Sequence, residues 1–329
     1  YQYYQKNNLV EAERISRLIL VDKPQDVQAL HLLVVLENLA GRNEVAIHLL
    51  NQVITLCPNS SQGYLNLGKM FRDKGDFETA IEYYQKSLEL NPDYIEVYNE
   101  LGSIFFTLGK FLQSQKYYEE ALKLDKNYVN AHFGLAGILL KQGNFILGFS
   151  EYEWRWQSED FQTRSFSQPV WDGSSFQGKT LLVYTEQGLG DSIQFIRYIP
   201  LVKKLGGCVV VECNKAGLKL LFTTVSEIDE LFVRGETLPD FDLQIPLMSL
   251  PRIFGTTLET IPAEIPYLSV PKSIDFPIPP APEKNLKVGI CWQTNTTSET
   301  SQMRSCPVEY LQAIINIDRV NFYILQKEV

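Results

Sequence analysis

The chain has 329 residues, of which 45% are hydrophobic and 21% charged, a composition typical of folded, soluble proteins with two or three domains at this length. Its net charge of -9 argues against nucleic acid as a main partner, because phosphate binding requires a basic surface. No apolar run approaches the roughly 18 residues of a membrane span, no secretory signal opens the sequence, and the five cysteines lack metal or redox spacing. We therefore expect a cytoplasmic protein with no membrane span, metal or cofactor.

A period of 34 residues dominates the first half of the sequence. The repeating columns are Gly41, Gly75, Gly109 and Gly143; Ala12, Ala46, Ala80, Ser114 and Gly148; Leu33, Leu67, Leu101 and Leu135; and Tyr84, Tyr118 and Tyr152. This period is the length of a helix-turn-helix unit that stacks on copies of itself. We expect the glycines to end the first helix of each unit in a left-handed conformation, and the small residues to let its two helices approach closely.

These columns resemble those of tetratricopeptide-repeat proteins over roughly residues 1–160, and they predict an α-solenoid over 1–157. Full repeats are expected at about 27–60, 61–94, 95–128 and 129–162. The inner face of such a solenoid is formed by the first helix of each repeat. By repeat position this face includes Asn38, Lys69, Arg72, Asn99 and Asn130. We expect these side chains to bind an extended peptide or a protein partner, and the alternative is a solvated helix face.

The repeat pattern gives way to a linker over 158–179, which has no helical period and contains several turn-forming residues. Three tryptophans, Trp154, Trp156 and Trp171, lie on either side of its central part. We expect their indoles to seal the repeat stack against the next domain.

Strand-like runs then alternate with helical segments, which predicts a parallel sheet and a Rossmann-like domain over 180–270. The strand-like runs are 180–185, 208–213, 230–234 and the beginning of 242–250. A proline-rich linker follows at 271–285. A second alternating unit begins at 286–329, with strands at 287–292 and 321–325 and a helix at about 307–317. Because it is shorter than a usual domain, we expect an incomplete second Rossmann-like half.

A glycine-rich turn follows the first of these strands, where open parallel sheets place their ligands. One interpretation is a dinucleotide-binding site, since Gly188 and Gly190 fit the fingerprint and Glu212 ends the second strand. However, Ile193 stands where the third glycine belongs. A second interpretation makes Asp191 the general base of a glycosyltransferase acceptor cleft. The third is that Asp191 only caps the following helix, a role that aspartate favours.

Several motifs carry a resemblance over roughly residues 150–329: EYEWRW, WDGSSFQGKTLLVYTEQGLGDSIQFIRYIP, IPLMSLPRIFGTTLETIPAEIPYL, VGICW and RSCP. They resemble bacterial tetratricopeptide-repeat glycosyltransferases, which are similar to heptosyltransferases and to O-linked N-acetylglucosamine transferases of the two-domain GT-B fold. The resemblance implies an intracellular, metal-independent transfer of sugar from a nucleotide-sugar donor to a protein or glycan acceptor. It makes Asp191 the base that deprotonates the acceptor hydroxyl.

The resemblance also assigns two loops. The acceptor loop contains Glu186, Gln187, Gly188 and Gly190, and the donor diphosphate loop contains Asn295, Arg304 and Ser305. Arginine is a good diphosphate partner, and the alternative for Arg304 is a solvated loop charge.

The family's nucleotide pocket lies mostly in the second half of its second domain, which this sequence does not contain. We therefore expect the chain as given not to turn over sugar nucleotides. The competing class is a non-catalytic tetratricopeptide scaffold for protein interactions with a degenerate α/β domain.

Overall fold

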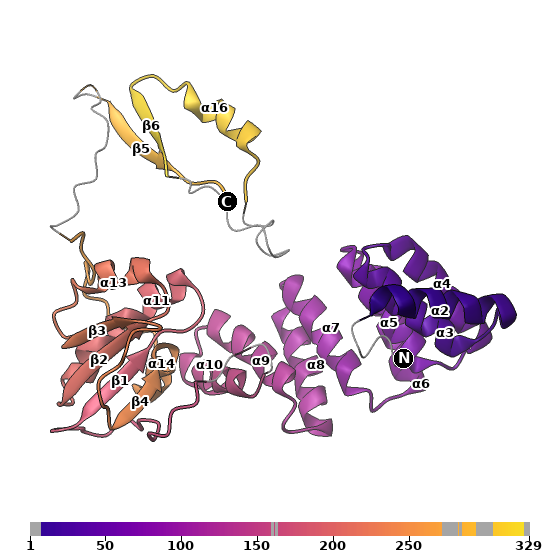
Figure 1. Cartoon of the computed structure of the whole chain (residues 1–329), viewed down its shortest axis with the longest axis horizontal. Helices are drawn as coiled ribbons and strands as arrows, with labels where there is room; N and C mark the ends of the chain where they lie inside the picture. The colour runs from indigo at the N-terminus through magenta and orange to yellow at the C-terminus, as the bar shows by residue number, and fades with distance from the viewer. Residues whose placement is uncertain are drawn as a thin grey trace. The chain divides into compact units, whose positions relative to one another are not determined.

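The computed structural model describes residues 8–158, 161, 164–271, 282, 285–293 and 305–325. The chain divides into two compact units, Tyr1–Ser269 and Val270–Val329. The first contains paired helices followed by a sheet, and the second contains two strands and short helical turns (Figure 1).

Paired helices make up the repeat region of the first unit. They are α2 (Leu9–Asp22), α3 (Val27–Leu39), α4 (Asn43–Leu56), α5 (Ser61–Asp73), α6 (Phe77–Leu90), α7 (Ile95–Thr107), α8 (Phe111–Leu124), α9 (Val129–Lys141) and α10 (Phe145–Tyr152), which a 3₁₀ turn, η1 (Glu153–Gln157), extends. The first helix of each full repeat is therefore α3, α5, α7 or α9. This confirms the helical solenoid that the period predicts.

The four periodic glycines end these first helices as expected. Their φ angles are 72°, 79°, 72° and 79°. At Gly75 the amide donates to the Arg72 carbonyl, and the next amide, that of Asp76, donates back to Phe71. This pair of bonds satisfies carbonyls that the helix end leaves open, and it requires a left-handed residue that glycine adopts without strain.

The other columns form the core of the repeats. The leucine column is buried throughout, and Ala46, Ala80 and Ser114 have no exposed surface. The buried rings of the tyrosine column lie directly over glycines. A β-carbon added at Gly68 would lie 2.3 Å from the Tyr84 ring, so only glycine lets these helices approach so closely.

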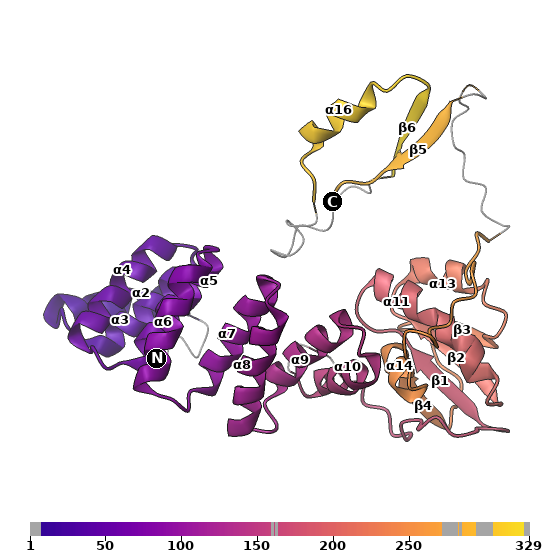
Figure 2. The same ribbon diagram turned by 180° about the vertical axis from the view of Figure 1, so that it is seen from behind.

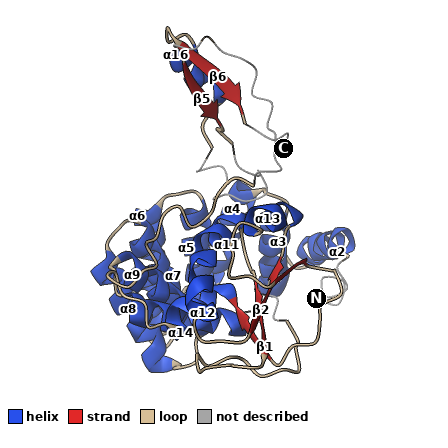
Figure 3. Cartoon of the chain, turned by 90° about the vertical axis from the view of Figure 1, so that its left-hand side faces the viewer, coloured by secondary structure: helices blue, strands red, loops and turns tan. Residues whose placement is uncertain are grey.

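The sheet of the first unit has four parallel strands. They are β1 (Thr180–Tyr184), β2 (Cys208–Cys213), β3 (Glu230–Val233) and β4 (Leu243–Pro246), in the order β3-β2-β1-β4 (Figure 1; β1 and β2 are also labelled in Figure 3). The strand order reverses between β1 and β4, where open sheets of this kind bind ligands at the carboxyl edge. All four strands begin within a residue of the positions predicted from the sequence.

Short helices connect and cover the strands. They are α11 (Leu189–Phe195), η2 (Ile196–Tyr198), α12 (Ile199–Lys203), α13 (Ala216–Phe222), η3 (Leu247–Ser249) and α14 (Leu250–Ile253). The core between them and the sheet contains Val183, Val211 and Ile245, none of which has exposed surface.

The end of the repeat stack packs on this core. Phe149 and Tyr152 of α10 join the core cluster of the sheet, and the Phe149 ring meets Phe195 edge-on at 6.0 Å. Trp156 lies at this junction as expected, against the guanidinium of Arg155, whereas the other two tryptophans lie elsewhere. Trp154 stacks on His132 of the last repeat. Trp171 lies within the core of the sheet, where its indole N–H donates to the Ser174 carbonyl.

The second unit contains β5 (Leu286–Ile290) and β6 (Val320–Ile324), which pair in parallel (Figure 2). Between them lie a 3₁₀ turn, η4 (Val308–Leu311), and a single helical turn, α16 (Gln312–Ile315). The helical run therefore covers 308–315, within the helix expected at about 307–317, and its first half is a 3₁₀ turn.

Candidate functional site

The loop that follows β1 is held in an unusual conformation. Gln187 has φ 58°, which costs a residue with a side chain about 1–2 kcal/mol. Its carbonyl accepts a hydrogen bond from Asn214 Nδ2 at 2.8 Å, and its own amide nitrogen Nε2 donates to the Tyr152 hydroxyl. Asn214 also bonds Thr185 at the end of β1. The surrounding contacts therefore determine the path of this loop.

Asp191 is the third residue of α11, and it is half-buried. Its Oδ2 accepts a hydrogen bond from the Gly188 amide at 3.1 Å, so it caps the helix from within the first turn. Gly188 and Gly190 are exposed, and no heavy atom lies within 4 Å of a β-carbon built at Gly190. The capping role is thus visible in the structure, and the role as a general base stays a prediction.

Glu186 is the buried member of the predicted acceptor loop. Its partner is Arg155 of η1, which donates from Nη2 at 2.8 Å and from Nε at 3.4 Å. Burial raises the pKa of the Glu186 carboxyl, although Arg155 acts to lower it. The site therefore contains a buried ion pair between the repeat stack and the sheet.

Arg155 is a residue that sequence reasoning missed. Its side chain is 0% exposed, and its guanidinium carbon lies over the Tyr152 ring at 4.7 Å and over the Trp156 ring at 4.4 Å. The signal was a charged residue flanked by aromatic residues in the EYEWRW motif, a pattern that favours a buried, stacked guanidinium.

The dinucleotide interpretation does not fit the end of β2. The Glu212 side chain is 1% exposed and is already bonded by Arg164, with Arg234 at 4.0 Å. A carboxylate held in this way cannot serve as the acceptor for a ribose hydroxyl without losing these partners. Together with Ile193, this argues against a dinucleotide in the turn.

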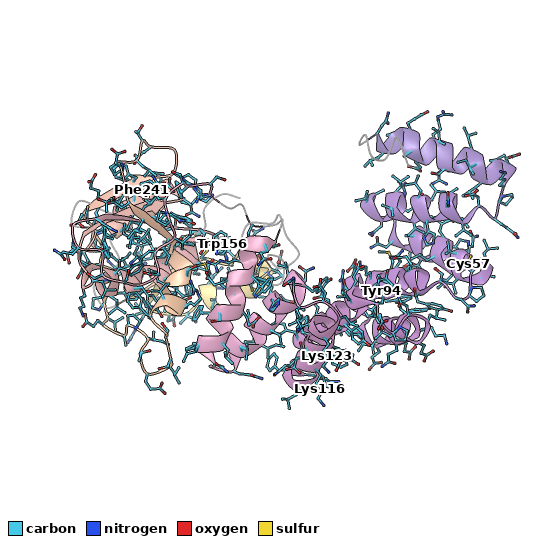
Figure 4. The ribbon with its side chains drawn as sticks, turned by 90° about the horizontal axis from the view of Figure 1, so that it is seen from below. Cys57, Tyr94, Lys116, Lys123, Trp156 and Phe241 are labelled. Atoms are coloured by element: carbon cyan, nitrogen blue, oxygen red, sulfur yellow. The ribbon has the colours of Figure 1, made fainter. Side chains whose placement is uncertain are left out.

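The predicted peptide-binding residues lie on the first helices of successive repeats. Asn38 and Asn130 are exposed, and Asn99 is half-buried. The two cations are both paired with the neighbouring repeat: Lys69 contacts Glu96 of α7, and Arg72 contacts Glu100 of α7. This part of the face is therefore polar but nearly balanced in charge. By contrast, Lys116 and Lys123 lie on α8, the second helix of its repeat, and both are exposed (Figure 4).

The predicted donor loop lies mainly outside the described residues. Asn295 and Arg304 belong to the part that the structure does not describe, whereas Ser305 is described and half-buried. The Cys306 amide donates to the Trp292 carbonyl at 2.8 Å, which ties the two ends of the loop together. The assignment of these residues to a diphosphate stays a prediction.

Among the described residues, no three His, Cys, Asp or Glu side chains gather closely enough to hold a metal ion. No helix in the same ranges has the length and apolar character needed to cross a membrane.

Known protein families match the central repeats. A family model described as TPR repeat matches residues 68–109, and one described as Tetratricopeptide repeat matches residues 95–128. The chain contains tetratricopeptide repeats. A search of curated proteins found no match.

Several solved structures are similar to part of the chain. A crystal structure of MamA has 20% identity and a TM-score of 0.43, and covers 48% of this chain and 93% of its own. The pilF protein of Pseudomonas aeruginosa has 20% identity and a TM-score of 0.45, covering 49% and 73%. A thermophilic TPR protein of Thermus thermophilus has 20% identity and a TM-score of 0.41, covering 48% and 87%.

Proposed function

We propose that the chain is a protein-interaction scaffold whose repeats bind an extended peptide segment of a partner. The observation that supports this most directly is the regular tetratricopeptide stack itself. Each repeat contacts its neighbours through the same buried columns, so its outward-facing positions recur along one continuous surface. Such a surface suits a partner that runs along several repeats.

The polar residues on the first helices indicate how such a partner is held. Asn99 and Asn130 carry amides that both donate and accept hydrogen bonds, which matches the alternating N–H and C=O groups of an extended backbone. Lys69 and Arg72 are neutralised by Glu96 and Glu100, so a strongly charged partner has little to gain there. The face therefore favours main-chain contacts to a peptide of low net charge.

A peptide-display selection on the protein, followed by fluorescence anisotropy, tests this proposal. In Asn99→Ala/Asn130→Ala, a selected peptide should bind about tenfold more weakly, as expected for the loss of two hydrogen bonds. The matched control, Lys116→Ala/Lys123→Ala on α8, should bind as the parent does. Equal loss in both variants, or crosslinks confined to α8 and the other second helices, would contradict binding along the first helices.

We infer a second candidate, a glycosyltransferase, from one further observation. Asp191 lies in the first turn of α11, the helix that follows β1, next to the point where the strand order reverses between β1 and β4. In this reading its carboxylate takes the proton of an acceptor hydroxyl. The acceptor oxygen bonds to the anomeric carbon of the donor sugar, and the nucleoside diphosphate leaves with the electron pair of the broken bond.

A hydrolysis and transfer screen over a panel of nucleotide sugars tests this second candidate. Asparagine can still accept the Gly188 hydrogen bond, so Asp191→Asn should keep the turn intact. If Asp191 is the base, turnover should fall by about 10²–10⁴-fold. Unchanged turnover would leave Asp191 with its capping role alone.

A further inference from the structure

Arg155 joins three segments that are far apart in the sequence. From η1 it donates to Glu186 after β1 at 2.8 Å and to the Ser249 hydroxyl of η3 at 2.9 Å. It also bonds Glu153 of its own turn at 2.7 Å, and Ser249 in turn donates to Glu153 at 2.7 Å. The guanidinium therefore links the last turn of the repeat stack to the two strands that flank the reversal of strand order.

The loop after β1 is attached to the repeat stack at two successive residues. Glu186 is held by Arg155, and Gln187 is held by the hydroxyl of Tyr152. The ring of Tyr152 packs against the guanidinium of Arg155 at 4.7 Å, so the two attachments support each other. Gln187 is the residue whose left-handed conformation requires support from its surroundings.

The chemistry of the ion pair requires an arginine. A buried charge is costly unless it is paired and its remaining donors are satisfied, and here the guanidinium has three different side-chain acceptors. Lysine keeps the charge, but it has neither the planar fork nor the flat surface that packs on aromatic rings. The Arg155→Lys protein should therefore fold but bind the Glu186 carboxylate less tightly.

We propose that Arg155 is a positioning residue that fixes the conformation of loop 185–191 and so couples the end of the repeat stack to the carboxyl edge of the sheet. The coupling goes beyond the proposed function, since it acts whether the loop serves an acceptor or only a structural role. In this arrangement the last repeat is part of the site that the sheet presents, because its side chains determine the path of the loop.

Hydrogen exchange measured by mass spectrometry on the full chain tests the proposal. In Arg155→Lys, amides of loop 185–191, including Thr185 and Gly188, should exchange about tenfold faster, as expected for weakening a hydrogen bond to a charged group. Peptides that cover β2 should be unchanged. The matched control is Arg72→Lys, which alters another arginine on a buried carboxylate within the stack, and it should leave the loop unchanged.

A second variant separates positioning from general destabilisation. Arg155→Gln/Glu186→Gln removes both charges of the buried pair, and Glu153 keeps Arg252 at 3.6 Å as an ionic partner. The variant should therefore fold, and the loop should again exchange about tenfold faster than in the parent. Unchanged exchange in both Arg155 variants would overturn the proposal. So would faster exchange of the loop and β2 to the same degree, since that would show a loss of overall stability.

Discussion

The ring of Tyr118 on α8 offers the sharpest test of how the repeats pack. It lies between two glycines on the neighbouring first helices. A β-carbon at Gly134 of α9 would lie 2.2 Å from its Cζ, and one at Gly102 of α7 would lie 2.7 Å from its Cε1. The Tyr118 side chain is only 5% exposed, so it cannot retreat into solvent. Gly134→Ala should therefore force α8 and α9 apart.

The magnitude follows from two opposing effects. Alanine in the middle of a helix gains about 1 kcal/mol over glycine in propensity. Overpacking a well-filled core costs about 1–3 kcal/mol, and a ring clamped from both sides belongs at the upper end of this range. We expect Gly134→Ala to destabilise the protein by about 1–2 kcal/mol. The control is Gly217→Ala in α13, where no heavy atom lies within 4 Å of the added carbon. It should stabilise by about 0.5 kcal/mol.

Urea unfolding followed by far-ultraviolet circular dichroism measures these free energies. The double variant Gly134→Ala/Tyr118→Leu should cost less than the sum of the two single changes by at least about 1 kcal/mol, because the smaller side chain removes the clash. If Gly134→Ala is as stable as the parent, or if the two changes are additive, the ring does not hold the helices in the way described.

Three further predictions concern single residues. Gly75→Ala should lower the free energy of unfolding by about 1 kcal/mol, because its left-handed backbone strains a residue with a β-carbon. Gly75→Asn should lower it less, as urea midpoints will show, and equal losses would argue against backbone strain. Cys213 is buried, and burial raises the pKa of its thiol. Brief alkylation should therefore label the exposed Cys291 first, and rapid labelling of Cys213 would contradict its burial. Burial raises the pKa of Tyr118 to about 12, so folding favours the neutral phenol and stability should fall as the pH rises toward that value. Phenolate absorbance, measured against pH as the difference between the parent and Tyr118→Phe, should show a transition near pH 12. A transition near pH 10 would refute the raised pKa of Tyr118.

The sequence was sufficient for features that depend on neighbouring residues. The glycine period located four left-handed turns, because the backbone requirement at a helix end is local. Apolar runs located β1 and β2 to within a residue, because strands buried on both faces read as continuous hydrophobic stretches.

Contacts between distant residues were beyond the reach of sequence patterns. Arg155 meets partners 31 and 94 residues away, and a local pattern cannot show which carboxylate a buried cation will find. The way in which Asp191 caps its helix was likewise not visible in the sequence. The helix begins earlier than a capping aspartate would suggest, because the extended backbone of Gly188 supplies the N-cap, and Asp191 then reaches back from the third position.

The repetition of one packing unit has a consequence for how such a protein changes over time. Tyr84 rests on Gly68 as Tyr118 rests on Gly102, so each of these units closes its own helix pair with the same contact, and the buried leucine column repeats from unit to unit. A gene segment that encodes 61–94 can therefore be duplicated or deleted without creating an unmatched interface. The junction at Arg155 is untouched by such an event. The length of the stack is thus changed by whole repeats, while the contacts between its last repeat and the sheet are preserved.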